Sequence, residues 1–292
     1  MDFGIHLPHV GPLASRDTIL AAARRAEELG FHSLWVSDHV VIPREIAGRY
    51  PGRPDGRFPV PPDMPFLEPL SVLQFVAAAT ERVKLGTSIL VITMRNPVIT
   101  AKELATLDVL SNGRLILGAG AGWLREEFAA LNTPFEKHGP RMAEYLQVIL
   151  RCWTEDDPSF EGRFYHLPSV GFAPKPVQKP RPPVWLGGWA DGALRRVARY
   201  GDAWHAGGPP QMLGDLYAKV KGYAKKYGRD PDSITLSVRG DGIDRGDPDQ
   251  VLETLRAYEA AGASHILLTP IGRTPDELLT RIEHLAALTA RV

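Results

Sequence analysis

The sequence predicts a single α/β domain spanning residues 1–292, folded as a closed (β/α)8 TIM barrel. Eight short apolar segments, typical of buried strands, alternate along the chain with eight segments of helical periodicity. No change in composition along the chain marks a domain boundary. A doubly wound open sheet is the alternative, but its G-x-G-x-x-G fingerprint fails because Trp123 follows Gly118, Gly120 and Gly122.

The first half of the chain supplies four of the strand and helix pairs. Short apolar runs predict strands at 2–7, 33–37, 83–91 and 115–117. Helical patterns cover 16–29, 70–80, 97–110 and 139–153, and a further helix opens at 124–127. The first helix is capped by Ser15 or Asp17 and stopped by Gly30, and the third has Asn96 as its cap with Pro97 at its first position.

The second half continues the alternation. Strands are expected at 184–186, 202–206, 234–239 and 264–269, and helices at 192–200, 212–227, 248–261 and 275–289. The last helix begins with a capping box formed by Thr274 and Glu277. A small hairpin is expected at 160–167.

Two proline-rich segments, at about 40–69 and 154–183, interrupt this alternation. Their prolines exclude a long helix and a central strand. We therefore expect insertions at the carboxyl-terminal face of the strands. The first follows a strand directly, so it should form an ordered lid rather than a domain linker.

Charge and composition exclude several classes of partner. Lys+Arg and Asp+Glu number 34 each, so no net basic field would attract nucleic acid. No apolar run approaches the length of a membrane span and no signal-peptide pattern is present, so we expect a soluble, cytoplasmic protein. The one cysteine, Cys152, excludes an internal disulfide and lies in a helical pattern as a core residue.

Active sites of such barrels lie at the carboxyl ends of the strands, which fixes the residues to consider. The side chains expected to form a substrate pocket there are His6, Arg95, Trp123, Trp189 and Arg239. Tryptophans offer large hydrophobic walls, and the glycines after the strand at 115–117 let the backbone lie against a flat ligand. A tight turn from strand to helix is the other interpretation of these glycines. Together the residues favour a planar cofactor, whereas scarce carboxylates argue against a carbohydrate hydrolase.

A metal centre is the first alternative class of site. Five side chains near the strand ends could converge on a metal: His6, His9, Asp38, His39 and His205. Metal-dependent barrel hydrolases usually carry H-x-H on the first strand, whereas this chain has H-x-x-H interrupted by Pro8, so we expect no metal. Asp38 and His39 could also be a pair that stabilises a loop or caps a helix.

Six motifs, in their order and spacing along the chain, carry a resemblance to a known family. They are Ser37-Asp38-His39, Lys84 to Leu90 with Arg95-Asn96-Pro97, Asp108 to Arg114, Gly118-x-Gly120-x-Gly122-Trp123, Pro183 to Gly188, and Gly201-Asp202-Ala203-Trp204. The chain resembles the luciferase-like monooxygenase superfamily, and specifically its deazaflavin-dependent branch, which uses coenzyme F420. The resemblance reaches from the first strand to the last helix and implies a TIM barrel with a flavin or deazaflavin in its mouth.

The resemblance also implies cofactor contacts, position by position. Ser88-Ile89 matches a non-proline cis peptide that forms a bulge behind the cofactor's central ring. Asp38 matches an aspartate that contacts the deazaflavin ring system, and Ala121 and Gly122 match further ring and ribityl contacts. A pair of glycines, Gly187 and Gly188, matches the backbone that receives the cofactor's phosphate, where N–H groups at a helix start suit an anion.

His39 is the residue to which the resemblance gives a catalytic role. It matches the histidine that serves as acid or base in the sugar-phosphate dehydrogenases of the branch. Their catalytic glutamate is replaced here by Trp123, so oxidation of glucose 6-phosphate is not expected. Trp123, Trp189 and the lid around 50–66 favour an apolar or aromatic substrate, with an arginine (Arg95 or Arg239) available for a carboxylate or carbonyl.

The expected function is an F420-dependent oxidoreductase that transfers a hydride between the deazaflavin C5 and a small organic substrate. An FMN-dependent monooxygenase that activates O2 is the alternative, because the same bulge and glycines serve either ring. A deazaflavin-binding protein without catalysis is a third possibility. A homodimer is the default expectation for such a barrel.

Overall fold

The computed structural model describes residues 1–53, 55–240, 242–243 and 246–292. Positions 54, 241, 244 and 245 lie outside these ranges, and position 54 falls within the first predicted insertion. In the described part of the chain, no helix combines the length and apolarity that crossing a membrane requires.

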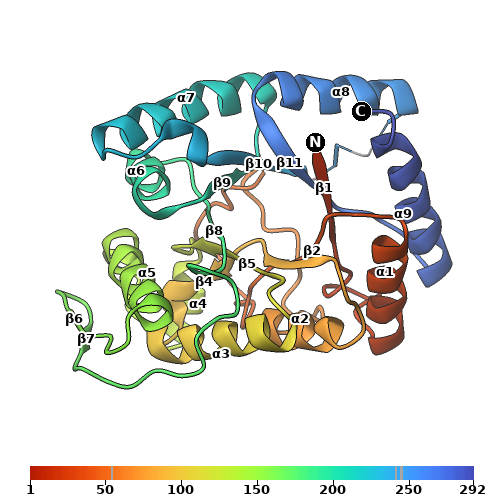
Figure 1. Ribbon diagram of the computed structural model, residues 1–292. Coiled ribbons are helices and arrows are strands. Elements are labelled where there is room, and N and C mark those ends of the chain that lie inside the picture. Colours follow the sequence, from red (N-terminus) through yellow and green to blue (C-terminus); the bar gives the residue numbers. More distant parts are fainter. Residues whose placement is uncertain (54, 241, 244–245) are drawn as a thin grey trace.

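Within the described residues, nine parallel strands form one sheet that closes on itself (Figure 1). Their order is β3-β2-β1-β11-β10-β9-β8-β5-β4, and β3 also pairs with β5, which closes an eight-stranded barrel and leaves β4 as a short extension beside β5. The strands are β1 (Asp2–His6), β2 (Ser33–Val36), β3 (Lys84–Thr87), β4 (Leu90–Val91), β5 (Leu115–Gly120), β8 (Val184–Leu186), β9 (Ala203–Ala206), β10 (Thr235–Gly240) and β11 (Ala263–Leu268). The predicted (β/α)8 barrel is therefore confirmed.

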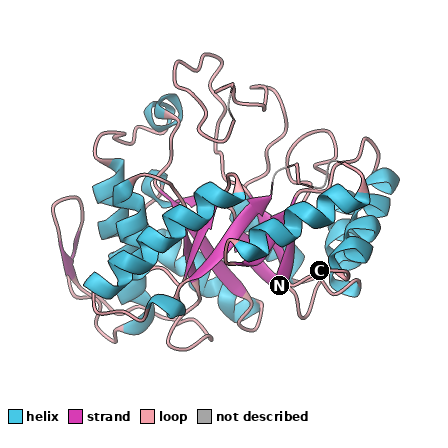
Figure 2. Cartoon of the chain, turned by 90° about the horizontal axis from the view of Figure 1, so that it is seen from above, coloured by secondary structure: helices cyan, strands magenta, loops and turns pink. Residues whose placement is uncertain are grey.

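Helices surround the barrel and cover it from outside (Figure 2). They are α1 (Arg16–Glu28), α2 (Pro69–Ala77), α3 (Pro97–Leu110), α4 (Arg125–Ala130), α5 (His138–Thr154), α6 (Asp191–Tyr200), α7 (Pro210–Lys226), α8 (Pro248–Ala260) and α9 (Pro275–Thr289). Their starts follow the sequence signals: Asn96 caps α3 through its side-chain oxygen, and Thr274 caps α9. All of these helices except α4 contribute apolar residues to the core around the strands, and Cys152 is buried on α5.

Trp35 on β2 fills the interior of the barrel. Its indole is fully buried, lies 4.9 Å from the Trp185 ring and stacks on the His205 ring at 5.2 Å between centroids. Glycines on neighbouring strands make the room: a Cβ on Gly86 would lie 2.4 Å from the indole carbons, and one on Gly4 would lie 2.6 Å from the indole nitrogen. The interior is thus a packed core, and the functional site is confined to the end of the barrel.

The predicted strand at 83–91 is broken in the structure. β3 ends at Thr87, a cis peptide joins Ser88 to Ile89, and β4 resumes at Leu90. The break could not be predicted from the apolar run, because a bulge contains the same residue types as a continuous strand. The cis peptide implied by the family resemblance is present at the expected position.

The first insertion lies where the sequence predicts it, after β2 at the carboxyl ends of the strands. Phe66 forms a bridge with Val10 in the loop after β1, and the backbone N–H of Leu67 donates to the carbonyl of His9. At its start, the backbone N–H groups of Val40 and Ala47 donate to glutamates of α4. These contacts hold the segment over the barrel as an ordered cover.

The second insertion differs from the prediction in its position. Residues 154–183 connect α5 to the amino end of β8, with a hairpin of β6 (Phe160–Glu161) and β7 (His166–Leu167). The amide of Gln178 donates to the carbonyl of Leu115, the first residue of β5. The insertion therefore lies toward the amino ends of the strands and the outer helices. A connection that leads from a helix into a parallel strand must end there.

Candidate functional site

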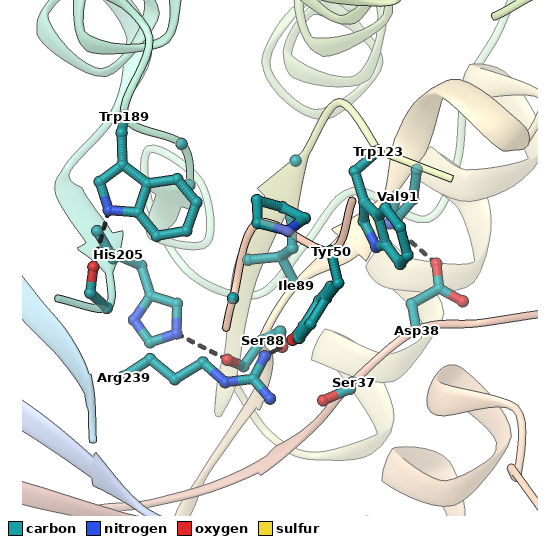
Figure 3. Close-up of a pocket in the computed structure, with 18 of the residues that line it drawn as sticks. Ser37, Asp38, Tyr50, Ser88, Ile89, Val91, Trp123, Trp189, His205 and Arg239 are labelled. Carbon is teal, nitrogen blue, oxygen red and sulfur yellow. Dashed lines mark hydrogen bonds between the residues drawn. The ribbon is translucent and has the colours of Figure 1, made fainter. Parts of the chain in front are cut away.

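A cavity of about 1010 Å³ opens at the carboxyl ends of the strands, beneath the first insertion. Figure 3 shows Trp189 and Trp123 on opposite sides of it, with Ile89 between them. Twelve of the thirteen residues predicted for the site line this cavity: His6, Asp38, His39, Ser88, Ile89, Ala121, Gly122, Trp123, Gly187, Gly188, Trp189 and Arg239. The volume suits a cofactor and a small substrate together.

Arg95 is the exception, and its expected place in the substrate pocket is corrected. Its guanidinium donates to the Asp38 carboxylate at 2.8 Å and pairs with Glu68 at 3.2 Å, and it is absent from the cavity lining. The side chain was assigned to the pocket because it follows the third strand. That strand ends earlier than predicted, and the 3-10 turn Ile92–Met94 carries Arg95 behind the wall.

Asp38 reaches the cavity, but its carboxylate is already occupied. The side chain is fully buried, one oxygen accepts from Arg95, and the other accepts from the backbone N–H of Val91 at 2.9 Å (Figure 3). Desolvation raises the pKa of Asp38, and Arg95 opposes this rise. The carboxylate thus fixes β4 and the bulge, and its contact with a cofactor ring stays a prediction.

The Ser88–Ile89 peptide forms a bulge at the centre of the cavity wall. Arg239 donates to the Ser88 carbonyl at 2.8 Å, and the Ser88 hydroxyl contacts Nε2 of His205 at 2.8 Å. Gly120 on β5 makes space for Ile89, because a Cβ on this glycine would lie 1.6 Å from the Ile89 Cδ1. The bulge is therefore held from several strands, as a rigid support for a flat ligand requires.

Gly122 turns the chain sharply just after β5. Its φ of 82° is unfavourable for residues with a side chain, and a Cβ there would lie 2.6 Å from the Phe128 ring. Ala121 accepts from the Thr93 hydroxyl through its carbonyl. Both interpretations of the glycine run therefore hold: it makes a tight turn and it lines the cavity.

The start of α6 forms the opposite end of the cavity and suits an anion. The N–H of Gly187 donates to the Ala119 carbonyl at 3.0 Å, so it cannot also bind a phosphate as the sequence suggests. Gly188, with φ of 108°, leads into α6, where the N–H of Ala193 donates to the carbonyl of the N-cap residue Ala190 and no partner among the described residues is found for the N–H groups of Asp191 and Gly192. Ala190, Ala193 and Arg196 line the cavity from this helix.

Arg196 adds a positive charge to this end. Burial lowers the pKa of its guanidinium, and none of the ion pairs found among the described residues involves it. A half-buried cation beside helix N–H groups is an arrangement that can bind a phosphate. Arg196 could not be predicted from the ends of the strands, because it lies within α6.

His39 is paired with a carboxylate that sequence reasoning did not assign. Its Nδ1 lies 2.7 Å from an oxygen of Glu127, and the two side chains are only 10% and 2% exposed. The other Glu127 oxygen accepts from the backbone N–H of Val40 at 2.7 Å. Glu127 thus fixes the ring with Nδ1–H toward itself, which leaves Nε2 as the atom able to accept or donate a proton in the cavity.

Glu127 lies in α4, four positions after Trp123, which precedes the helix, and this spacing explains why it was missed. The glutamate expected from the family resemblance is absent at position 123, and α4 instead carries a carboxylate back to His39 from position 127. The sequence feature that could have indicated a carboxylate near the site is the pair of consecutive glutamates at the start of α4, Glu126 and Glu127.

An aromatic wall covers His39. Phe58 and Phe66 of the first insertion lie 4.8 and 5.4 Å from its ring, and Tyr50 and Phe58 lie 5.1 and 5.5 Å from the Trp123 ring. These contacts join the insertion to the barrel mouth. They surround the histidine with aromatic surface and favour an apolar or aromatic molecule next to it.

Residues 1–286 match the family model described as luciferase-like monooxygenase. The chain belongs to this family. Among its curated relatives is an F420-dependent glucose-6-phosphate dehydrogenase of Amycolatopsis mediterranei, 34% identical over 184 residues, which cover 62% of this chain and 50% of the relative. Another is an FMNH2-dependent dimethylsulfone monooxygenase of Pseudomonas putida, 30% identical over 214 residues, which cover 68% of this chain and 59% of the relative.

The solved structure of a coenzyme F420 dependent tetrahydromethanopterin reductase from Methanopyrus kandleri shares the fold. It matches with a TM-score of 0.75 over 96% of both chains, at 19% identity. Luciferase-like monooxygenases thus include F420-dependent and FMN-dependent relatives of this chain, which supports an oxidoreductase. In the described residues, no group of three or more His, Cys, Asp and Glu side chains could hold a metal.

Buried histidines should make this protein less stable in acid. Desolvation lowers the pKa of His6 and His265 well below 6.5, and it lowers the pKa of His205 to about 3. Their stabilising contribution is complete above pH 6.5 and is lost as the pH falls toward the folded-state values. The free energy of unfolding, measured by urea titration at pH 7, 6 and 5, should fall by up to about 1.4 kcal/mol per pH unit for each histidine. His265→Asn should reduce the slope of the unfolding free energy against pH by up to about 1.4 kcal/mol per pH unit, which corresponds to one proton. An unchanged slope would show that His265 does not take up a proton on unfolding.

Proposed function

We propose that the chain is an F420-dependent oxidoreductase that transfers a hydride between the deazaflavin C5 and a small, apolar or aromatic organic substrate. The observation that carries the proposal is the His39–Glu127 pair. Hydride transfer to a carbonyl, imine or activated double bond leaves a negative charge that a proton must neutralise, and a carboxylate-oriented imidazole in a covered cavity suits that step.

The cavity's residues fit a cofactor with a flat ring at one end and a phosphate at the other. Ile89 stands as a support for the ring, and Gly188 with Arg196 and the start of α6 would hold the phosphate. When bound, the reduced deazaflavin supplies a hydride. The chain itself would position the two reactants and exclude water.

His39 and the aromatic wall would act on the substrate. Nε2 of His39 would deliver a proton to the substrate atom that becomes negative, or remove one in the reverse direction. Glu127 would stabilise the protonated ring while that charge is present. Trp123, Tyr50 and Phe58 would pack against the apolar part of the substrate.

The proposal is tested with reduced F420 that carries deuterium at both hydrogen positions of C5 and a panel of ketones, enones and imines, in the absence of O2. We expect a reduced product that has gained one deuterium. A product without deuterium, or no turnover with any of the three classes, would count against hydride transfer from this cofactor.

An FMN-dependent monooxygenase is the second candidate, because a relative with 30% identity is FMNH2-dependent and the same ring support serves a flavin. It is distinguished by its use of O2. Reduced FMN with the protein and an apolar substrate would then incorporate oxygen from 18O2 into the product.

Replacing Arg196 by Met should weaken the binding of phosphate-bearing cofactors specifically. Loss of a charge-assisted hydrogen bond should raise the Kd for F420 or FMN by roughly 10- to 100-fold. Riboflavin, which lacks the phosphate, is the matched ligand, and its Kd should not change. Arg199→Met on the exposed side of α6 is the matched control variant. An equal effect on FMN and riboflavin would remove Arg196 from the phosphate site.

A further inference from the structure

A chain of six buried side chains crosses the barrel interior and ends at the cavity. The chain runs through Trp35, Ser33, His265, Ser237, His205 and Ser88, all at most 3% exposed. Successive hydrogen-bonding atoms are 2.7 Å (Trp35–Ser33), 2.9 Å (Ser33–His265), 2.8 Å (His265–Ser237), 2.8 Å (Ser237–His205) and 2.8 Å (His205–Ser88) apart. It links β2, β11, β10 and β9 to the bulge after β3.

The protons in this chain can be counted. Three hydroxyl groups, two neutral imidazoles and one indole carry six protons, whereas the chain contains five contacts. The imidazoles are neutral because desolvation lowers the pKa of both histidines, to about 3 for His205. One proton is therefore left without a partner inside the chain.

Burial decides which proton this is, because Ser33 is fully buried with no other acceptor found among the described residues, whereas Ser88 lines the cavity. Trp35 can only donate, so Ser33 accepts from it and completes its own bonding by donating to Nε2 of His265. His265 then donates from Nδ1 to Ser237, Ser237 donates to Nδ1 of His205, and His205 donates from Nε2 to Ser88. Any other order leaves the hydroxyl proton of Ser33 or Ser237 without an acceptor in the core, which is unfavourable.

The remaining proton belongs to Ser88. Among the six residues only Ser88 and His205 line the cavity, and both ring nitrogens of His205 are already bonded. Arg239 donates to the Ser88 carbonyl, so the bulge is held at its carbonyl and at its hydroxyl oxygen. The Ser88 hydroxyl must find its acceptor on whatever occupies the cavity.

We propose that this chain of hydrogen bonds has one fixed direction and makes the Ser88 hydroxyl an obligatory donor to an acceptor atom of the bound ring. Ser88 is then a specificity-determining residue, and Ser33, Ser237, His205 and His265 are positioning residues that act through it. Only the identity of the ring as a deazaflavin rests on the proposed function. A flat heterocycle with a carbonyl or imine-type nitrogen facing the bulge satisfies the chain, whereas one that presents an N–H there does not.

The direction is tested first on the ligand-free protein by 15N NMR of the histidine rings. His265 should carry its proton on Nδ1 and His205 on Nε2, so the two rings should be opposite tautomers. The signals are assigned with His265→Asn and His205→Asn, and neutron diffraction of the wild type replaces this step if those variants do not fold. The same tautomer in both rings, or both protons exchanged between nitrogens, would overturn the proposal.

The link to the cavity is tested by a double-mutant cycle. Ser33→Ala leaves Nε2 of His265 without a partner in either direction, so the preference for the original direction should weaken. Ser88 can then donate back to His205, and the Kd of the bound cofactor should rise roughly tenfold. Ser88→Ala should have a similar effect, and adding Ser33→Ala to it should change the Kd no further. Ser264→Ala, on the neighbouring position of β11, is the control and should leave both tautomers and Kd unchanged.

The probes are oxidised F420 and FMN, titrated separately. Independent, additive effects of the two substitutions would show that Ser33 acts only on stability and would overturn the coupling. If neither probe binds the wild type, the proposed function fails while the tautomers still decide the direction of the chain.

Discussion

His39→Asn is expected to lower kcat by about 10²- to 10⁴-fold and to leave the Kd of the cofactor little changed. Asn can keep the hydrogen bond that His39 makes with Glu127, but it cannot exchange a proton at the position of Nε2. The measurement is steady-state turnover combined with a cofactor titration. Glu127→Gln should give a smaller loss in kcat, because it keeps the geometry and removes the charge.

His166→Asn is the matched control for this substitution. His166 is exposed on the β6–β7 hairpin, which lies outside the cavity lining. It should leave turnover unchanged. A His39→Asn enzyme with full turnover would exclude the imidazole as the proton donor, and a large rise in cofactor Kd would assign it to binding instead.

Gly118→Ala is expected to cause the largest loss of stability among single substitutions in the barrel wall. A Cβ at this position would lie 1.7 Å from the carbonyl oxygen of Thr87, and that oxygen belongs to the backbone of β3 and cannot move aside. We expect the free energy of unfolding to fall by about 3 kcal/mol or more, measured by urea denaturation.

Gly222→Ala is the control for this effect. Gly222 lies in α7 and a Cβ there would meet no atom within 4 Å. Alanine should therefore stabilise the helix by about 0.5 to 1 kcal/mol. If both substitutions had the same small effect, the close approach between β3 and β5 would not be the reason for glycine at position 118.

The barrel could be predicted from the sequence because each strand and helix carries a local signal. Asn96 and Thr274 are N-cap residues that predict the starts of α3 and α9, and short apolar runs predict the strands. The position of most site residues followed from the same alternation, since the ends of parallel strands meet at one face. The family resemblance added the cis peptide at Ser88–Ile89, which no local pattern indicates.

The pairings inside the site could not be predicted because they join distant parts of the chain. Glu127 reaches His39 across 88 positions, and Ser33 reaches His265 across 232. Gly120 was interpreted as making room for a ligand, whereas in the structure its missing side chain first makes room for Ile89. The predicted place of Arg95 in the substrate pocket was wrong because its ion pair with Asp38 also joins distant parts of the chain.

The most direct test of the account is a titration of the ligand-free protein with oxidised F420 and, separately, with FMN, followed by fluorescence quenching. The account predicts saturable binding of F420 with a Kd at least roughly tenfold lower than that of FMN, which corresponds to about 1.4 kcal/mol of binding free energy. It also predicts that Arg196→Met weakens this binding. Tighter binding of FMN would contradict the proposed cofactor and would direct the search for substrates toward O2-dependent oxidation.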